Sequence, residues 1–401
     1  MDHKSVNQVN EDTKGNCPQI FNYVTVRYAS HPHTLSSPTA PTHTTQPTHT
    51  SFPQFNLLLL LDMGKKKKGG KKKGGKSAPS VPSATPEEFI KNYTMACKLY
   101  SSEPSDCVKK GLETEEGAVK PYLFIDEAVG PAGVRAATSA MLGAHPDMKG
   151  GKFTVFTSMN FVRCNAQADG AAAVAEVLRV GGPDMPNTNL LMCDCRIGER
   201  GCQALGAALG YGGNTTLKRL KLQYDETIGD RGASMLSRSL RMNGVLEVIH
   251  LEYCNIGAVG CRGVAKILEY GGTQVKELSL QGNPITGIGL NSIASALSKN
   301  LVLETLNLRD CGVGRDSDDL DGIEALKESL VVNQTLQALQ FEENFIGDEG
   351  AEIFASMDDD SKKNLKQLWI EFEGVSAGLF AAASISKGGK GGKKGKKKKK
   401  K

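Results

Sequence analysis

The chain has 401 residues, of which 39% are hydrophobic, with 10 cysteines and a formal net charge of +5. Its N-terminus lacks the basic segment, long apolar run and small-residue cleavage site of a secretion signal, so we expect reduced cysteines. The leucine run at residues 57–61 is far shorter than the roughly 20 apolar residues that cross a bilayer, which excludes it as a transmembrane helix.

The charge is distributed unevenly along the chain. Residues 65–76 hold 8 lysines and residues 387–401 hold 10, in both cases interspersed with glycine, while residues 1–64 have 3 basic and 4 acidic residues. The remaining residues, 77–386, therefore carry a net charge of −12. We expect an acidic folded body with two flexible cationic tails.

The N-terminal region predicts no folded structure. Residues 1–62 are rich in Ser, Thr, Pro and His without helical or strand periodicity, and we predict disorder over residues 1–84, including the lysine-glycine run at 65–76. Met63 directly precedes that run, and the sequence is compatible with translation from Met1 or from Met63. Residues 70–77 match the spacing of a phosphate-binding loop, but no strand precedes them and no helix follows, so we reject a nucleotide site.

Regular structure is predicted to begin at Thr85. The residues Thr85-Pro86-Glu87-Glu88 have the pattern of a capping box with proline at the first helical position. Apolar residues follow at helical spacing as far as Tyr100, and a second short helix is predicted over residues 105–112. We expect residues 85–118 to form a helical cap over the first unit of the array that follows.

Residues 119–380 are repetitive. Residues 246–260, LEVIHLEYCNIGAVG, follow the pattern LxxLxLxxCxIGxxG, and similar copies begin at residues 156, 187, 217, 275, 303, 336 and 365, at intervals of 28 to 33 residues. Residues 122–142 keep the glycines of the pattern without its leucines. This period predicts a leucine-rich repeat solenoid with eight clear repeats and one degenerate repeat.

Within a repeat, positions are numbered from the first leucine of the pattern. The LxxLxL segment predicts a short strand with its leucines in the core. The Cys or Asn at position nine turns the chain and can form a hydrogen bond to a buried backbone group. A helix is predicted after the glycines. The expected fold is α/β, a horseshoe with a concave parallel sheet and convex helices. We predict that the cysteines at position nine act as small buried hydrophobic residues. They are Cys164, Cys195, Cys254 and Cys311.

The repeat pattern is similar to that of a known family. Repeats of 28 to 31 residues with a CxIGxxG segment resemble the ribonuclease-inhibitor type of leucine-rich repeat, which also occurs in Ran GTPase-activating proteins and in NOD-like receptors. The resemblance covers residues 120–375. It implies the fold directly and leaves the partner open, because such arrays bind very different proteins.

Positions five, seven and eight should project from the concave sheet and are the candidate partner-binding positions. Aromatic and arginine side chains are the usual anchors of protein interfaces, which favours Tyr224, Tyr253, Trp369 and Arg309. Trp369 lies in the last repeat, where its side chain could equally serve to cover the end of the hydrophobic core instead of binding a partner. The full predicted set is Lys221, Tyr224, His250, Glu252, Tyr253, Arg309, Glu342 and Trp369.

No residue pattern predicts catalysis, a cofactor or a metal. His250 lies next to Glu252 without a nucleophile and is interpreted as a solvated surface histidine. The Cys193-Asp194-Cys195 segment lacks the further ligands of a zinc site.

The acidic insertion at 315–321 places acids at calcium-loop spacing from Ser317, which occupies a position that calcium loops give to Asp. The repeat register requires a helix from Gly322, so we predict a solvated loop with helix-capping acids.

The lysine tails predict contact with an anionic polymer or surface. Each lysine contributes about 1 kcal/mol near an anionic membrane, and on nucleic acid it releases counterions. The tails have no aromatic residues, so RNA binding would be non-specific. Acidic protein tails, the acidic body itself and a nuclear localisation receptor are alternative partners.

The sequence favours a non-catalytic scaffold that binds a protein through the repeat surface, as a monomer or within a hetero-complex. The expected location is cytoplasmic, cytoskeletal or ciliary, or nuclear. One alternative is a small-GTPase activator resembling the Ran-specific proteins. Their acidic tail and FTGR segment have no counterpart here, where residues 153–158 read FTVFTS. A second alternative is an RNA-associated or nucleolar protein that acts through its tails.

Overall fold

The computed structural model describes residues 83–112, 120–315, 319–358, 362–371 and 373–386. The chain divides into a unit at residues 1–76 and a unit at residues 77–401, and the fold below is that of the second. Predictions about residues 1–82, both lysine runs, the start at Met1 or Met63 and Ser317 concern residues outside this description.

The described strands form one sheet of ten strands arranged in chain order. Strands β1 to β9 pair in parallel, and β10 pairs with β9 in the antiparallel direction. The strands are β1 (Tyr122–Ile125), β2 (Ser158–Val162), β3 (Asn189–Cys193), β4 (Arg219–Gln223), β5 (Val248–His250), β6 (Glu277–Ser279), β7 (Thr305–Asn307), β8 (Ala338–Gln340), β9 (Gln367–Trp369) and β10 (Ile385–Ser386).

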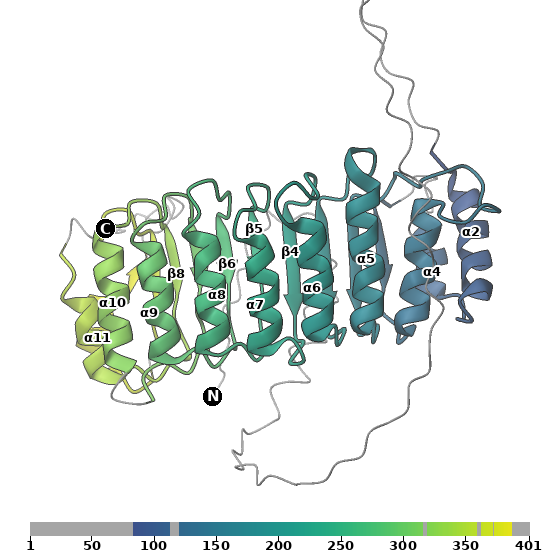
Figure 1. Cartoon of the computed structure of the whole chain (residues 1–401). Helices are drawn as coiled ribbons and strands as arrows, with labels where there is room; N and C mark the ends of the chain where they lie inside the picture. The colour runs from purple at the N-terminus through teal and green to yellow at the C-terminus, as the bar shows by residue number, and fades with distance from the viewer. Residues whose placement is uncertain (1–82, 113–119, 316–318, 359–361, 372, 387–401) are drawn as a thin grey trace, which may run out of the picture. The chain divides into compact units, whose positions relative to one another are not determined.

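Helices follow the strands and form a second layer. Figure 1 shows α4 to α11 side by side in chain order, on one face of the sheet. The helices are α2 (Pro86–Leu99), α3 (Asp106–Leu112), α4 (Gly130–Leu142), α5 (Gln167–Gly181), α6 (Gly198–Leu209), α7 (Gly229–Leu240), α8 (Ala258–Leu268), α9 (Thr286–Leu297), α10 (Asp319–Val332), α11 (Gly347–Ala355) and α12 (Ala377–Ala383), with a 3₁₀ turn at Gly182–Asp184.

This arrangement confirms the predicted α/β leucine-rich repeat solenoid. Adjacent strands lie about 4.8 Å apart, whereas packed helices need about 8–10 Å. With one strand and one helix in a repeat, the array therefore favours curvature with the sheet on the inner side. We call the sheet face opposite the helices the open sheet face.

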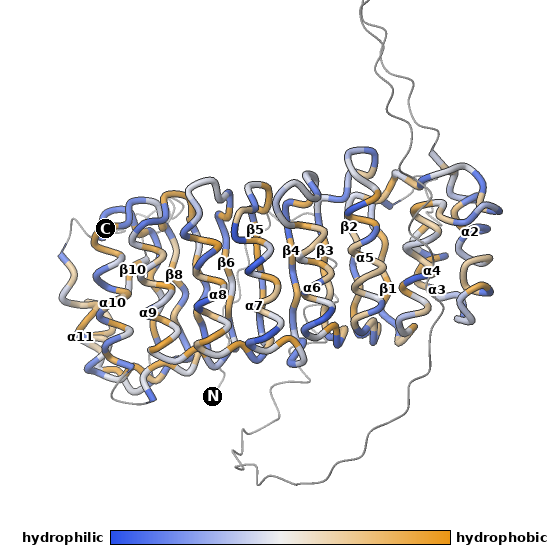
Figure 2. The backbone as a smooth tube through the Cα atoms, viewed as in Figure 1, coloured by the Kyte–Doolittle hydropathy of each residue, from blue (hydrophilic) through white to orange (hydrophobic). Residues whose placement is uncertain are grey.

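Each repeat contributes the same side chains to the core between the two layers. In the repeat that begins at Leu246, the residues Leu246, Ile249, Leu251, Cys254 and Ile256 are at most 1% exposed. Apolar and polar segments alternate along the helices in Figure 2, as expected of helices that are covered by the sheet on one side. Fully burying such a side chain contributes about 1.5–3 kcal/mol.

Position nine satisfies buried backbone groups, as predicted. The Cys254 thiol lies 3.2 Å from the carbonyl oxygen of Leu222 in the preceding repeat. Asn283 satisfies more backbone groups than a cysteine does. Its amide N–H donates to the carbonyl oxygen of Leu251 at 2.7 Å, and its amide oxygen accepts from the backbone N–H groups of Cys254 and Ile256. These contacts lock neighbouring repeats in register.

A second row of asparagines was not predicted. Each precedes position one by three residues, donates to a carbonyl oxygen of the preceding repeat and accepts from the backbone N–H of position one. Asn243, for example, donates to Leu209 and accepts from Leu246. The row contains Asn214, Asn243, Asn300 and Asn333.

The N-terminal cap begins as predicted. The Thr85 hydroxyl accepts from the backbone N–H of Glu88, and the Glu88 carboxylate accepts from the backbone N–H of Thr85. Phe89 of α2 packs on Phe153 and Phe156, with ring centroids 4.6 Å and 5.4 Å apart. The cap is thereby joined to the first clear repeat through aromatic packing.

Two predicted boundaries are corrected. Disorder was expected from residue 381, but α12 runs to Ala383 and β10 covers Ile385–Ser386. A helix was expected to begin at Gly322, but α10 begins at Asp319, which is 4% exposed. The Asp319 carboxylate accepts from the backbone N–H groups of Gly287, in the first turn of α9, and of Gly314. It therefore caps the preceding helix instead of lying in a solvated loop.

Candidate functional site

The open sheet face presents the predicted residues in register. At position five the paired residues of β3, β4 and β5 are Leu191, Lys221 and His250. The row continues through Ser279, Asn307, Gln340 and Trp369. Position three projects to the same face because side chains alternate along a strand, and it adds Arg219 and Glu277, which the sequence prediction omitted.

Tyr224 and Tyr253 are brought together at the end of adjacent strands. Both residues have a left-handed backbone, with φ of 54° and 53°. Their rings are stacked, with centroids 4.8 Å apart and planes inclined by 10°. Gly282 at the equivalent position of the next repeat leaves room for the Tyr253 ring, which a β-carbon at Gly282 would overlap. The three repeats therefore fix one aromatic pair.

His250 is buried, which corrects the prediction of a solvated histidine. Its side chain is 10% exposed, and its Nε2 lies 2.7 Å from Oε1 of Glu277. Its Nδ1 lies 3.4 Å from Oε1 of Glu252 without forming a hydrogen bond among the described residues. The hydrogen bond from His250 lowers the pKa of Glu277, against the effect of burial. His250 is thus a structural link between β5 and β6.

Further hydrogen bonds connect side chains of neighbouring repeats across the face. Gln223 donates to Glu252 at 2.6 Å. In the next repeats, Asn307 donates to Gln281 at 3.0 Å, and Gln281 donates to the Tyr253 hydroxyl at 3.2 Å. Such lateral bonds restrict rotamers before any partner arrives, which reduces the entropy lost on binding.

The C-terminal end of the face is acidic. Arg309 pairs with Glu343, and the backbone N–H of Glu343 donates to Glu371 at 2.9 Å. Burial raises the pKa of Glu342, with Glu343 and Glu371 adding to the shift. Within the described part of the chain, Oε2 of Glu342 is buried without a hydrogen-bond partner.

Trp369 is half-buried on β9, where its carbonyl oxygen accepts from the backbone N–H of Phe341 at 2.8 Å. The eight predicted residues are therefore spread from β4 to β9. The structure groups Lys221, Tyr224, His250, Glu252 and Tyr253 on two neighbouring repeats, with Arg309, Glu342 and Trp369 further along the sheet. Their role in binding stays a prediction.

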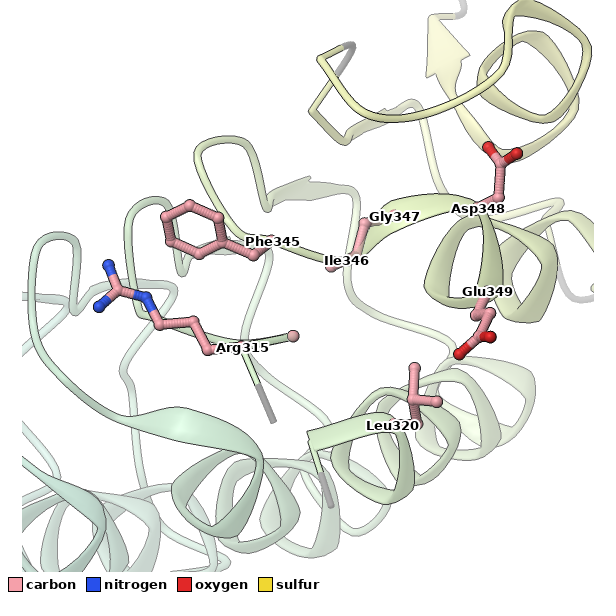
Figure 3. Close-up of a pocket in the computed structure, with 8 residues that line it drawn as sticks. Arg315, Leu320, Phe345, Ile346, Gly347, Asp348 and Glu349 are labelled. Atoms are coloured by element: carbon pink, nitrogen blue, oxygen red, sulfur yellow. The ribbon is translucent and has the colours of Figure 1, made fainter. Parts of the chain in front are cut away.

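A pocket of about 440 Å³ lies away from these residues, between the loops that precede α10 and α11. Figure 3 shows Arg315 beside Phe345, with Asp348 and Glu349 on the first turn of α11. The Arg315 guanidinium lies 4.4 Å from the Phe345 ring centroid. Residues 316–318 follow Arg315 in the sequence and are outside the described residues, so we assign this pocket no ligand.

Among the described residues, every cysteine except Cys107 is buried. Burial raises the pKa of Cys193 to about 12, so this thiol is protonated and unreactive at neutral pH. Over the same residues, no group of three His, Cys, Asp or Glu side chains is placed to hold a metal ion. No described helix is long and apolar enough to cross a membrane.

Comparisons with known proteins agree with this geometry. A family model described as "Leucine Rich repeat" matches residues 213–237 and 332–355. Ribonuclease inhibitor from Sus scrofa is 33% identical over 128 residues, which cover 31% of this chain and 26% of that protein. NACHT, LRR and PYD domains-containing protein 12 from Mus musculus is 29% identical over 127 residues, covering 31% of this chain and 11% of that protein.

Solved structures give weaker similarity. The actin-binding site 2 of leiomodin-1 is 20% identical with a TM-score of 0.27, covering 31% of this chain and 70% of that chain. The complex of Rad7 and Elc1 in yeast is 10% identical with a TM-score of 0.25, covering 73% of this chain and 89% of that chain. These scores are too low to support an inference.

The repeated strand-helix units and the matching family model define the class of this chain, which is a leucine-rich repeat protein. The position-nine cysteines and asparagines and the curated relatives specify it further. Its repeats are similar to those of ribonuclease inhibitor and of NACHT, LRR and PYD domains-containing protein 12. The chain spans only 26% and 11% of the lengths of the two curated relatives named here.

Proposed function

We propose that this chain is a non-catalytic scaffold that binds a protein partner on its open sheet face. The observation that carries the proposal is the set of partly exposed side chains on β4 to β9, held in place by hydrogen bonds between neighbouring repeats. Protein interfaces favour such preorganised polar surfaces around aromatic anchors. Ribonuclease inhibitor, a relative named for inhibiting a protein, is compatible with this use of the fold.

The lysine tails are proposed to attach the scaffold to an anionic partner. The runs at 65–76 and 387–401 carry 8 and 10 positive charges. Acidic protein tails, as on a cytoskeletal or axonemal polymer, fit this charge, as does RNA in a nucleolar setting. The proposal therefore divides the chain into a specific surface on the repeats and two non-specific tethers.

The test is affinity capture from cells with three tagged forms of the full chain. Tyr224→Ala/Tyr253→Ala removes the aromatic pair on the open face, and Tyr211→Ala/Tyr270→Ala removes two tyrosines that follow α6 and α8. The first variant should lose partners that the wild type and the second variant retain. Retention of every partner by the first variant would contradict the role of the open face.

The tails are tested separately. Replacing the lysines of 65–76 and 387–401 with glutamine should change the location of a fluorescent fusion while leaving the partners of the open face bound. An unchanged location would exclude tethering. Acceleration of GTP hydrolysis by a purified small GTPase, measured with the purified chain, would replace the scaffold proposal with the GTPase-activator alternative.

A further inference from the structure

The basic side chains of the open sheet face differ in whether they form an ion pair with a neighbouring repeat. Arg163 pairs with Asp126 of the preceding repeat at 2.6 Å, and Arg309 pairs with Glu343 of the following repeat. Arg219 and Lys221 on β4 have no ion pair or hydrogen bond of their side chains among the described residues. Two of the four cations are thus in direct ion pairs with neighbouring repeats. The other two interact with Glu277 only at longer range.

The sheet register explains why the β4 cations are unpaired. Arg219 lies between Asn189 and Val248, and Lys221 lies between Leu191 and His250. None of these neighbours carries a carboxylate. The acids one step away are already engaged, because Glu277 contacts His250 at 2.7 Å and Glu252 accepts from Gln223 at 2.6 Å.

The two cations are also close together and partly buried. They alternate on one strand, which places both on the open face. Burial and the positive charge of Arg219 lower the pKa of Lys221, despite the nearby Glu277 and Glu252. An anion placed between the two side chains would relieve this repulsion and form charge-assisted hydrogen bonds.

We propose that Arg219 and Lys221 receive a carboxylate side chain of a protein partner, on the same face of the sheet as the Tyr224–Tyr253 pair. This inference rests on the proposed function, because it names the chemistry that the open face recognises. Tyr224 lies three residues beyond Lys221, about 10 Å further along the chain, so the tyrosine pair would contact a neighbouring residue of the same partner segment rather than the acid itself. The partner segment therefore combines an acidic residue with a nearby apolar residue.

A nucleic acid fits this place less well. The face becomes acidic towards β8 and β9, where Glu342, Glu343 and Glu371 lie. A phosphate backbone running along the sheet would be repelled there. The Tyr253 ring also lies between Tyr224 and the backbone of Gly282, so a base cannot stack on that ring.

The experiment selects peptides from a random display library on the full-length chain. The wild type is compared with Arg219→Gln/Lys221→Gln and with Arg262→Gln/Lys266→Gln, which removes two charges from exposed positions on α8. All three proteins carry the same lysine tails, so peptides that bind the tails are selected equally. Thermal melts confirm that each variant folds.

We call Arg219→Gln/Lys221→Gln the β4 variant and Arg262→Gln/Lys266→Gln the α8 variant. The selection is expected to yield acidic peptides. Measured by fluorescence anisotropy, these peptides should bind the β4 variant about tenfold more weakly than the wild type or the α8 variant. A reversed variant, Arg219→Glu/Lys221→Glu, should select basic residues in place of acidic ones. Undiminished binding of acidic peptides to the β4 variant would overturn the inference.

The outcomes also separate the inference from the proposed function. Peptides lost by Tyr224→Ala/Tyr253→Ala but kept by the β4 variant would overturn the carboxylate site and leave the binding face intact. Peptides kept by both variants would overturn both proposals. Loss of a fluorescent single-stranded RNA by the β4 variant, with retention by the α8 variant, would replace the protein partner with a nucleic acid.

Discussion

At the scale of single residues, the buried asparagines of position nine do more than fill space. Asn283 is 1% exposed, and its side chain bonds to backbone groups of two repeats. The equivalent cysteines contact carbonyl oxygens but offer no oxygen to the backbone N–H groups. Asparagine at this position therefore contributes stabilisation that cysteine does not provide.

Asn283→Ala is expected to lower the free energy of unfolding by about 2–5 kcal/mol, because it leaves buried backbone donors and acceptors unsatisfied. Urea denaturation monitored by circular dichroism measures the change. Asn291→Ala at an exposed position of α9 is the matched control and should change stability little. Equal effects of the two substitutions would exclude this role of Asn283.

Glu342 carries a charge that folding disfavours. Because burial raises its pKa, the folded chain binds the proton more tightly than the unfolded chain does, and stability decreases as pH rises from about 4.5 through the raised pKa. Glu342→Gln should therefore increase the melting temperature at pH 7 and remove this part of the pH dependence. Glu352→Gln, at an exposed position of α11, removes the same charge without that effect.

At the scale of elements, the short strand β10 ends the sheet. It pairs with β9 through Ile385 opposite Leu368, and Ile385 is 8% exposed. Without β10, the backbone groups of β9 and an apolar surface would be open to pairing with other molecules. A two-residue strand thus protects the C-terminal edge of the array.

A chain that ends at Ala383 is expected to be less stable by about 1.5–3 kcal/mol, from the lost burial of Ile385, and to aggregate on heating. A chain that ends at Ser386 retains β10 and should melt as the full chain does. Thermal melts with light scattering compare the two. Identical melting and scattering would show that β10 does not protect the edge.

At the scale of the whole molecule, the negative charge is concentrated in the last repeats. Residues 310–373 carry a net charge of −12, whereas residues 77–309 have 23 basic and 23 acidic residues. In a solenoid each repeat contacts only its neighbours, so repulsion in the last repeats acts locally. The two parts of the array should therefore respond differently to salt.

Raising sodium chloride from about 20 mM to about 300 mM should slow backbone hydrogen exchange in residues 319–371 and leave residues 122–309 nearly unchanged, because screening reduces like-charge repulsion. Mass spectrometry of the exchanged peptides measures this on a chain ending at Ser386, from which the C-terminal lysines are absent. A uniform response along the array would exclude a local electrostatic effect.

The sequence alone determined the architecture. The period of 28 to 33 residues, the leucines of each LxxLxL segment and the glycines before each helix predicted the solenoid, because one unit repeated in register leaves few other ways to bury those residues. Boundaries were less accurate at Asp319 and Ser386. There the helix and strand depend on contacts with other repeats rather than on local pattern.

Only the tertiary structure decided the chemical state of the outward side chains. Position in the repeat predicted that Lys221, His250 and Glu252 share a face, but not that His250 is buried against Glu277 or that Arg219 and Lys221 are unpaired. Those outcomes depend on which residues of neighbouring strands lie opposite one another. That register joins residues about 30 positions apart in the chain, beyond the reach of a local pattern.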